Sequence, residues 1–194
     1  MLQDQVHDLA FYDPLTQLAN RRLLLEHLSQ KLRSLPRQRG HGALLFLDLD
    51  NFKTLNDAHG HGAGDLLLIE VAQRLKACVR NIDTVARFGG DEFVVLLGSL
   101  SSERSQAQRQ AGTIAEKIRT SLAQPYHVAI NAADQPQARV QHHGSASIGV
   151  LVFDQHDQAP HALIDRADTA MYQAKQSGRN RVCFADDAPT APQR

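Results

Sequence analysis

Seven residues near the middle of the chain restrict its fold, because two adjacent glycines precede two adjacent carboxylates. Residues 87 to 93 read Arg-Phe-Gly-Gly-Asp-Glu-Phe, and an apolar run from Val94 to Leu97 follows directly. Glycine loses more conformational freedom than any other residue when it is ordered, and neighbouring carboxylates repel unless a cation lies between them. The pattern therefore indicates more than a structural turn. It predicts a tight hairpin whose bare backbone admits a ligand, with carboxylates at the tip that hold metal ions.

Composition limits the kind of protein that can surround this hairpin. The chain has 194 residues, which suits one domain with tails, and its hydrophobic content of 42% is enough for a core. Aromatic residues make up 5% and Trp is absent, so we expect an aliphatic core. Lys plus Arg and Asp plus Glu both number 21, whereas a nonspecific nucleic-acid binder normally has a basic excess. We therefore expect no nucleic-acid partner, and phosphate binding that relies on a few placed cations or on metal.

Cysteines and the N-terminus indicate a reducing compartment. Cys78 and Cys183 fall in a predicted helix and a predicted strand, where they resemble small core residues, and they build neither a disulfide framework nor a zinc site. Asp4 and Asp8 interrupt the segment where a signal peptide needs apolar residues, and no run approaches 18 apolar residues. We expect a soluble cytoplasmic domain without membrane contact, although its parent protein could be membrane-anchored.

Apolar periodicity and turn residues divide the chain into alternating helices and strands. We expect helices over residues 2–11, 21–35, 52–58, 63–80, 101–123 and 160–176, and strands over 43–47, 84–88, 92–97, 126–130, 140–153 and 181–185. The first long helix should end before Pro36, and a polar loop should surround Pro136. This order indicates an α/β or α+β fold with one central sheet. We expect a signalling helix or linker over 1–12, a catalytic domain over 13–185 and a disordered tail over 186–194.

Two segments before the hairpin carry candidate ligand groups, each with a structural alternative. Asp48 and Asp50 end an apolar strand, where open sheets often bind ligands, but they could equally cap the next helix. Their spacing does not fit an EF-hand. The segment Gly60 to Asp65 fits neither the dinucleotide nor the Walker glycine pattern. Asp65 could be an ordinary carboxylate at a helix start, and His61 an ordinary loop residue.

A third segment, Tyr172 to Asn180, places cations at the end of the last predicted helix. Lys175 and Arg179 are favoured there by the helix dipole alone, so their position has a structural explanation. Each of the three segments is ambiguous when it is taken by itself. Their order along the chain distinguishes the alternatives.

Five segments together resemble the GGDEF family of diguanylate cyclases. In family order they are a D-x-L-T-x-L-x-N-R entry, an F-x-D-x-D-x-F-K-x-x-N-D strand end, a G-H-x-x-G-D helix start, the GGDEF hairpin and a Y-x-A-K-x-x-G-R-N exit. They occur here at residues 13–21, 46–57, 60–65, 89–93 and 172–180. The resemblance covers about residues 10 to 185. Gln17 stands where many members have Gly, in an entry segment without a catalytic role.

The resemblance implies a fold and a reaction. The fold would be α+β, an α/β sandwich with a central, mostly antiparallel sheet flanked by helices, like the palm of polymerases and nucleotide cyclases. The reaction would condense two GTP molecules into cyclic di-GMP and two pyrophosphates, for bacterial second-messenger signalling. Each domain would hold one GTP, so catalysis would need a homodimer, and Mg²⁺, with Mn²⁺ as an alternative, would bind as two ions per half-site. An upstream sensory domain, absent from this chain, would control activity.

The resemblance also implies roles for individual residues. Metal would be held by Asp48, Asp91 and the Leu49 carbonyl, with Glu92 as a second-metal or base-assisting carboxylate and Lys53 stabilising charge in the transition state. Guanine would be read by Asn56 and Asp65, and phosphates would be bound by Lys53, Lys175 and Arg179. Other substrate contacts would come from Phe52, His61, Gly89 and Gly90. Two alternatives remain open: a catalytically silent domain that binds GTP or cyclic di-GMP, and a structural partner domain. Loss of the acidic residues would favour either one, and Asp48, Asp91 and Glu92 are all present.

Upstream of the hairpin, residues 80 to 83 read Arg-Asn-Ile-Asp. An R-x-x-D pattern at this offset resembles the inhibitory product site of the family. Arg80 offers a planar fork of donors, and Asp83 accepts from the guanine edge. Alternatively, Arg80 only ends a helix and Asp83 only caps the turn. Lys117 stands where some members contribute a second Arg, and it lacks the bidentate fork, so we expect weaker product binding than in those members.

Overall fold

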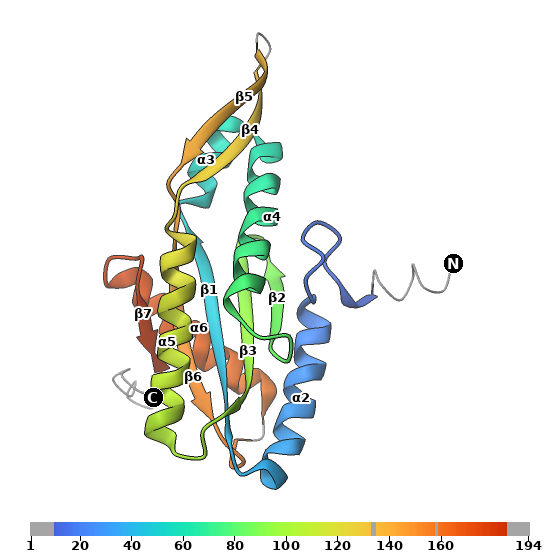
Figure 1. Cartoon of the computed structure of the whole chain (residues 1–194), viewed down its shortest axis with the longest axis vertical. Helices are drawn as coiled ribbons and strands as arrows, with labels where there is room; N and C mark the ends of the chain where they lie inside the picture. The colour runs from blue at the N-terminus through green and yellow to red at the C-terminus, as the bar shows by residue number, and fades with distance from the viewer. Residues whose placement is uncertain (1–9, 133–134, 158, 186–194) are drawn as a thin grey trace, which may run out of the picture.

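The computed structural model describes residues 10–132, 135–157 and 159–185. Its centre is a five-stranded sheet in the order β2-β3-β1-β6-β7, antiparallel except for the parallel pair β6 and β7. The strands are β1 (His41–Asp50), β2 (Thr84–Gly89), β3 (Glu92–Leu100), β6 (Ser145–Phe153) and β7 (Val182–Phe184). A separate hairpin pairs β4 (Tyr126–Ala132) with β5 (Gln135–His142) and projects beyond one end of the sheet (Figure 1). The expected central, mostly antiparallel sheet is confirmed.

Helices cover both faces of this sheet (Figure 1). They are α2 (Arg21–Gln38), α3 (Phe52–His59), α4 (His61–Cys78), α5 (Arg104–Leu122) and α6 (Pro160–Gln176). Residues alternate between faces along a strand, so Leu45 and Leu47 pack with α4 and α5 while Leu44 and Phe46 pack with α2 and α6. Every residue of β1 is buried, which explains the continuous apolar run from Ala43 to Leu47 within this strand.

Several element boundaries differ from the sequence prediction. Helix α2 continues through Pro36 to Gln38 and ends at Arg39, whose φ of 49° is left-handed. Helix α4 begins at His61 rather than at Ala63. The expected strand 140–153 is two strands, because the chain leaves the β4–β5 hairpin at His142 and enters the central sheet at Ser145. The backbone at Pro136 belongs to β5 rather than to a loop, and a strand paired on one side tolerates a residue without an N–H.

The described residues include little of the two predicted terminal segments and contain both cysteines. Of the helix expected over residues 2–11, only Ala10 and Phe11 lie within the described residues, and the tail expected after residue 185 lies outside them. Cys78 is buried and Cys183 is half-buried, and neither forms a disulfide within the described residues. Within the described part of the chain, no helix has the length and apolarity needed to cross a membrane.

Candidate active site

Two aspartates occupy the end of β1, on the face that α6 covers. Asp48 and Asp50 continue the alternation of Leu44 and Phe46, so their side chains point to the α2 and α6 side of the sheet. Both are buried, at 8% and 4% exposure. Helix α3 instead has Asn51 as its N-cap residue, without a side-chain cap bond. The interpretation of these aspartates as caps of the next helix is therefore wrong.

Asp48 is held by a lysine from the end of α6. The Lys175 ammonium lies 2.8 Å from Asp48 Oδ1, and the lysine side chain is 29% exposed. Burial raises the pKa of the Asp48 carboxyl, the hydrogen bond from Lys175 lowers it, and the charges of Asp91 and Asp50 raise it, with a net upward direction. The lysine therefore has a contact beyond the helix dipole. It partly neutralises a carboxylate that the protein buries at a cost.

The glycine hairpin brings its own carboxylates to the same point. Glu92 is the direct cross-strand partner of Asp48 in the β1–β3 pair, and the Leu49 N–H donates to the Asp91 carbonyl at 3.2 Å. Burial raises the pKa of Glu92, and the charges of Asp48, Asp168 and Asp91 raise it further. Asp48, Glu92 and Lys175 thus come together, with Asp91 and Leu49 adjacent. Asp168 of α6 was not singled out from the sequence, although it lies seven residues before Lys175 on the same helix.

The hairpin tip itself is open. Gly90 has a φ of 39°, and a Cβ added there would meet nothing within 4 Å. A Cβ at Gly89 would meet only Glu92 Oε2, at 3.8 Å. Gly89 still pairs with Glu92, so the turn proper consists of Gly90 and Asp91. The backbone here is exposed and free to approach a ligand, as the sequence predicts.

Asp50 has a different environment from Asp48. Its carboxylate accepts hydrogen bonds from the Ser145 and Ser147 hydroxyls, at 2.6 and 2.8 Å, and from the Asn180 N–H at 3.0 Å. These donors join the end of β1 to β6 and to the loop after α6. In the β1–β6 pair, Asp48 lies opposite Ser147 and Asp50 lies opposite Ser145. The matching i, i+2 spacing of the two serines and the two aspartates was the sequence signal that could have indicated this anchor. Asp50 therefore has a structural role.

The helices α3 and α4 form a second part of the site. Asn56 Oδ1 is buried without a hydrogen-bond partner among the described residues. A Cβ at Gly64 would collide with this amide and come within 3.1 Å of the Phe52 ring, so Gly64 is the space that lets α4 approach. Asp65 follows on α4 and is exposed in the second turn, beyond the first turn where a helix dipole acts. A helix-start role for Asp65 is therefore wrong, and an unsatisfied acceptor lies beside it.

The other predicted substrate contacts lie around these two parts. Lys53 is exposed in the first turn of α3, and His61 is the exposed first residue of α4. Arg179 follows α6 with a φ of 62°, and its N–H donates to the Ala174 carbonyl at 3.0 Å. This left-handed residue turns the chain back toward β7. The structure gives no ligand contact for these three side chains, so their roles stay predictions.

An arginine of the hairpin connects the tip to the entry segment. Arg87 Nε donates to the Gly90 carbonyl at 2.9 Å, and Nη1 lies 3.2 Å from Asp13 Oδ1. Asp13 also accepts from the Thr16 N–H and hydroxyl, at 2.8 and 2.6 Å. Burial alone would raise the pKa of Asp13, but the bonds from Thr16 and the charge of Arg87 bring it below its usual value. Sequence analysis did not predict this brace, because 74 residues separate its two ends.

The Arg80 to Asp83 turn lies at the other end of β2. Asp83 accepts from the Arg80 N–H at 2.9 Å and from the Gly98 N–H at 3.1 Å, so it does cap the turn. The Arg80 side chain is exposed. Lys117 donates to the Cys78 carbonyl at 3.2 Å, so it caps the end of α4. Asp83 therefore caps the turn through the Arg80 backbone, which leaves the exposed Arg80 guanidinium outside this bond, and the product-binding roles of both residues stay predictions.

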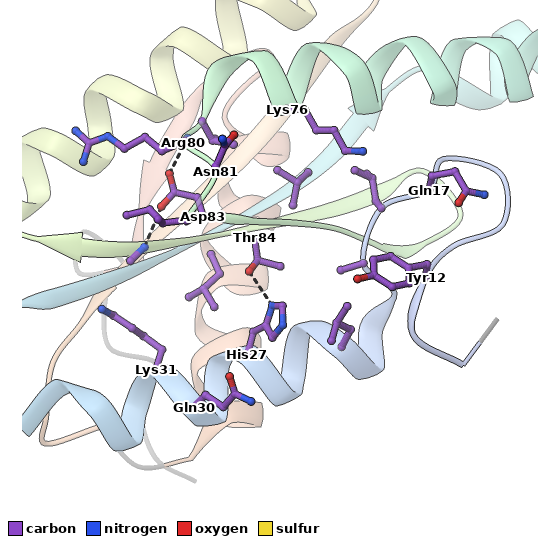
Figure 2. Close-up of a pocket in the computed structure, with 18 of the residues that line it drawn as sticks. Tyr12, Gln17, His27, Gln30, Lys31, Lys76, Arg80, Asn81, Asp83 and Thr84 are labelled. Atoms are coloured by element: carbon purple, nitrogen blue, oxygen red, sulfur yellow. Dashed lines mark hydrogen bonds between the residues drawn. The ribbon is translucent and has the colours of Figure 1, made fainter. Parts of the chain in front are cut away.

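A pocket of about 810 Å³ opens beside this turn. Figure 2 shows His27 and Lys31 rising from α2 and Lys76 extending from α4 around it. His27 Nδ1 lies 2.9 Å from the Thr84 hydroxyl, which ties α2 to β2. A second pocket, of about 730 Å³, lies between the start of α2 and the hairpin tip. Asp48 lines neither of these two pockets, so neither of them contains the carboxylate cluster.

The donor set at β1 suits a hard divalent cation. Among the described residues, no three His, Cys, Asp or Glu side chains are arranged to hold a metal ion by themselves. Mg²⁺ does not need such a cage, because it usually takes one or two carboxylates and completes its shell with water and substrate phosphate. Asp48 presents a buried carboxylate that already holds a cation, the Lys175 ammonium. The residues present therefore fit a metal that arrives with a phosphorylated substrate.

Comparisons with known proteins agree with this geometry. Residues 10–181 match the family described as diguanylate cyclase, GGDEF domain. The chain is 44% identical over 183 residues to the bifunctional diguanylate cyclase/cyclic di-GMP phosphodiesterase MucR of Pseudomonas aeruginosa, covering 94% of this chain and 24% of MucR. It is 38% identical over 163 residues to diguanylate cyclase A of Treponema denticola, covering 84% of this chain and 40% of that protein. The chain thus spans less than half the length of these relatives.

Solved structures show the same fold. The GGDEF domain of TpbB (YfiN) from Pseudomonas aeruginosa superposes with a TM-score of 0.76 at 39% identity, covering 90% of this chain and 94% of that chain. The coiled coil and GGDEF domain of DgcB from Caulobacter crescentus, solved in complex with c-di-GMP, gives a TM-score of 0.80 at 26% identity, covering 94% and 90%. With the family match over most of its length, the chain belongs to the GGDEF domain family of diguanylate cyclases.

Proposed function

We propose that this chain is the catalytic domain of a diguanylate cyclase, which condenses two GTP molecules into cyclic di-GMP with release of two pyrophosphates. The observation that carries the proposal is the cluster at the end of β1, where Asp48 lies opposite Glu92 and binds Lys175 beside the open glycine tip. Relatives at 38–44% identity that are named as diguanylate cyclases support it. A silent domain would have no need to keep a buried carboxylate with a raised pKa at this point.

Guanine recognition is assigned to α3 and α4. The buried, unpartnered Asn56 Oδ1 would accept a hydrogen bond from the guanine N1–H and N2–H₂ edge, and the exposed Asp65 carboxylate would accept a second. Adenine lacks donors at these positions, so it would leave the buried acceptor unsatisfied at a cost of about 1–3 kcal/mol. Phe52 lies with Asn56 against Gly64 and would fix the position of the guanine edge. His61, the first residue of α4, would add a substrate contact.

Phosphate binding is assigned to the cluster and to the helix ends. Lys53 in the first turn of α3, Lys175 in the last turn of α6 and Arg179 after it would neutralise the triphosphate, and the bare Gly89-Gly90 backbone would lie against it. When bound at Asp48, Asp91 and the Leu49 carbonyl, Mg²⁺ would supply charge neutralisation and activation of the attacking 3′-hydroxyl. Glu92, with its raised pKa, would accept or share the proton of that hydroxyl.

Each GTP must meet the 3′-hydroxyl of another GTP, so we propose that the active form is a homodimer with twofold symmetry. The exposed hairpin tip beside the cluster supports this, because Gly89 and Gly90 leave room for a second half-site to approach. The upstream part of a longer protein would set the approach of the two domains. We place the reaction in the bacterial cytoplasm, where GTP is available.

The test is production of cyclic di-GMP from GTP and Mg²⁺ by the purified chain, beside Asp91→Asn. We expect the wild-type chain to form product and Asp91→Asn to lose turnover while its far-UV circular dichroism and melting temperature stay unchanged, because a tip residue contributes little packing. Asp57→Asn, an exposed aspartate on α3, is the matched control and should retain activity. Tight GTP binding by the wild-type chain without any product would instead assign it as a silent binding domain.

We also propose that cyclic di-GMP inhibits the domain through Arg80 and the turn that Asp83 closes. The exposed guanidinium supports this, since the carboxylate preorganises the turn without occupying the arginine. Inhibition by added product should be noncompetitive with GTP, and Arg80→Ala should relieve it while activity without product persists. Arg109→Ala, an exposed arginine of α5, is the control. Equal product affinity for wild type and Arg80→Ala by isothermal titration, with inhibition unaltered, would overturn the assignment.

A further inference from the structure

We infer that, without nucleotide, the Lys175 ammonium occupies the Asp48 oxygen that would bind metal. Metal then binds tightly only when a nucleotide phosphate replaces Asp48 as the partner of Lys175. Lys175 would then couple metal binding to nucleotide binding, in addition to contacting phosphate. The inference rests on the proposed metal role of Asp48.

The ion pair is the first observation behind this inference. Lys175 Nζ lies 2.8 Å from Asp48 Oδ1, which is a contact distance for a charge-assisted hydrogen bond. The Asp48 side chain is only 11% exposed, so few directions remain from which a second cation could approach. The lysine is thus positioned on a ligand oxygen rather than near it.

Among the described residues, no other carboxylate approaches the Lys175 ammonium as closely as Asp48 does. The Asp50 carboxylate, two residues along the same face, already accepts three hydrogen bonds from Ser145, Ser147 and Asn180. Glu92 and Asp168 interact electrostatically with Lys175 but do not approach it as closely as Asp48 does. The ammonium therefore stays on Asp48 until another anion is offered.

Charge makes the two occupants exclusive. An ammonium and a divalent cation on neighbouring oxygens of one carboxylate would repel strongly in a site with restricted access to water. The lysine can leave, since its side chain is 29% exposed and lies in the last turn of α6, close in sequence to Arg179. A triphosphate gives the ammonium a new partner. Metal and nucleotide affinities must then be coupled, and the coupling is reciprocal.

The direct test is Mn²⁺ binding to the nucleotide-free chain, measured by electron paramagnetic resonance. We expect weak binding by wild type and at least tenfold tighter binding by Lys175→Gln, which leaves the Asp48 oxygen without a competing cation. Arg179→Gln is the matched control, because it removes a nearby positive charge that does not lie on Asp48, and it should bind Mn²⁺ as wild type does. Equal or weaker Mn²⁺ binding by Lys175→Gln would overturn the inference.

A second measurement covers the case in which the variant is poorly folded. Without metal, Lys175→Gln leaves a buried carboxylate uncompensated, so its melting temperature should fall below that of wild type. Mn²⁺ alone should restore the melting temperature of Lys175→Gln and change that of wild type much less. Lys175→Arg keeps the charge and should behave as wild type. A melting temperature of Lys175→Gln that Mn²⁺ does not raise would contradict the exchange.

The outcomes separate this inference from the proposed function. If wild type forms cyclic di-GMP while Lys175→Gln gains no Mn²⁺ affinity, the exchange fails and the cyclase assignment stands. If no variant forms cyclic di-GMP but Lys175→Gln gains Mn²⁺ affinity that the added Asp48→Asn substitution removes, the cyclase assignment fails and the exchange stands.

Discussion

Asp48 and Asp50 lie two residues apart on one strand and one face, yet the protein treats them oppositely. Asp50 accepts hydrogen bonds from three donors that belong to β6 and to the loop after α6. Asp48 has a single cation on one oxygen, beside further negative charge, and its pKa is raised first by burial. The hydrogen bonds of the fold satisfy Asp50, whereas Asp48 depends on a cation for its compensation.

The difference shows how a buried charge can be assigned a role without a ligand in view. Buried polar groups are normally satisfied by hydrogen bonds, so a carboxylate with three donors has less to gain from a metal than one with a single partner. A buried carboxylate with few hydrogen-bond donors is destabilised in its ionised form. Binding of a divalent cation can offset that free-energy cost.

The largest expected effect is on turnover by Asp48→Asn. In the proposed mechanism Asp48 would hold the metal that neutralises the reacting phosphates, so its neutralisation should lower kcat on the order of 10³-fold. The unfolding free energy should stay equal or rise, because the ionised Asp48 is disfavoured in the folded state and the partly exposed Lys175 can regain water. Activity assays and urea unfolding of the same preparation check both parts. A clear loss of stability in Asp48→Asn would show that its role is structural.

The next effect is on stability, in Asp50→Ala. Three donors lose a charged acceptor, two of them from buried or half-buried serines, so we expect about 3 kcal/mol of destabilisation by urea unfolding. Asp165→Ala, an exposed aspartate on α6, serves as the control and should change stability little. A change below about 0.5 kcal/mol in Asp50→Ala would remove the contrast between the two aspartates.

A smaller effect is expected on base selectivity in Asp65→Ala. Asp65 is exposed in the second turn of α4, so its removal should cost almost no stability, while the preference for GTP over ATP should fall about tenfold, as for one lost hydrogen bond to a charged group. Competitive binding of the two nucleotides measures the ratio, with Asp57→Ala beside it. An unchanged ratio would place the reading of the base elsewhere.

The smallest effect concerns pH and a third carboxylate, Asp13, which resembles Asp50 in being held by donors. Its pKa is lowered in the folded protein, so its stabilisation is present above the unfolded value of 3.8 and is lost as pH falls through the folded value. The unfolding free energy of wild type should exceed that of Asp13→Asn by about 1 kcal/mol near pH 7. This difference should shrink below pH 3.8. A difference that stays constant from neutral to acid pH in urea unfolding would contradict the assignment.

Local patterns predicted most of the fold, and the failures have physical causes. Apolar periodicity located the helices and the central strands, but it could not show that α2 continues through Pro36, since the tertiary packing of Leu35 overrides the local preference. It also joined β5 to β6, because strand patterning continues through His142 to Ser145 while the chain changes sheets.

The residues of the candidate site were predictable from their local motifs, whereas most contacts between distant segments were not. Asp48, Glu92 and Lys175 were singled out from separate motifs, and the structure brings them together. The brace between Arg87 and Asp13 and the anchor on Asp50 were missed, because each depends on pairs far apart along the chain. Only the register of the sheet and the packing of α6 determine which of several aspartates is left without enough donors.

The space at Gly64 has a consequence for how this domain can change over time. Any larger side chain there would push the Asn56 amide out of its buried position, even though Gly64 itself is assigned no part of the nucleotide. A drift in base preference therefore requires no alteration at Asn56 or Asp65. It can begin with one methyl group on the neighbouring helix, at a position that a survey restricted to ligand-contacting residues would pass over.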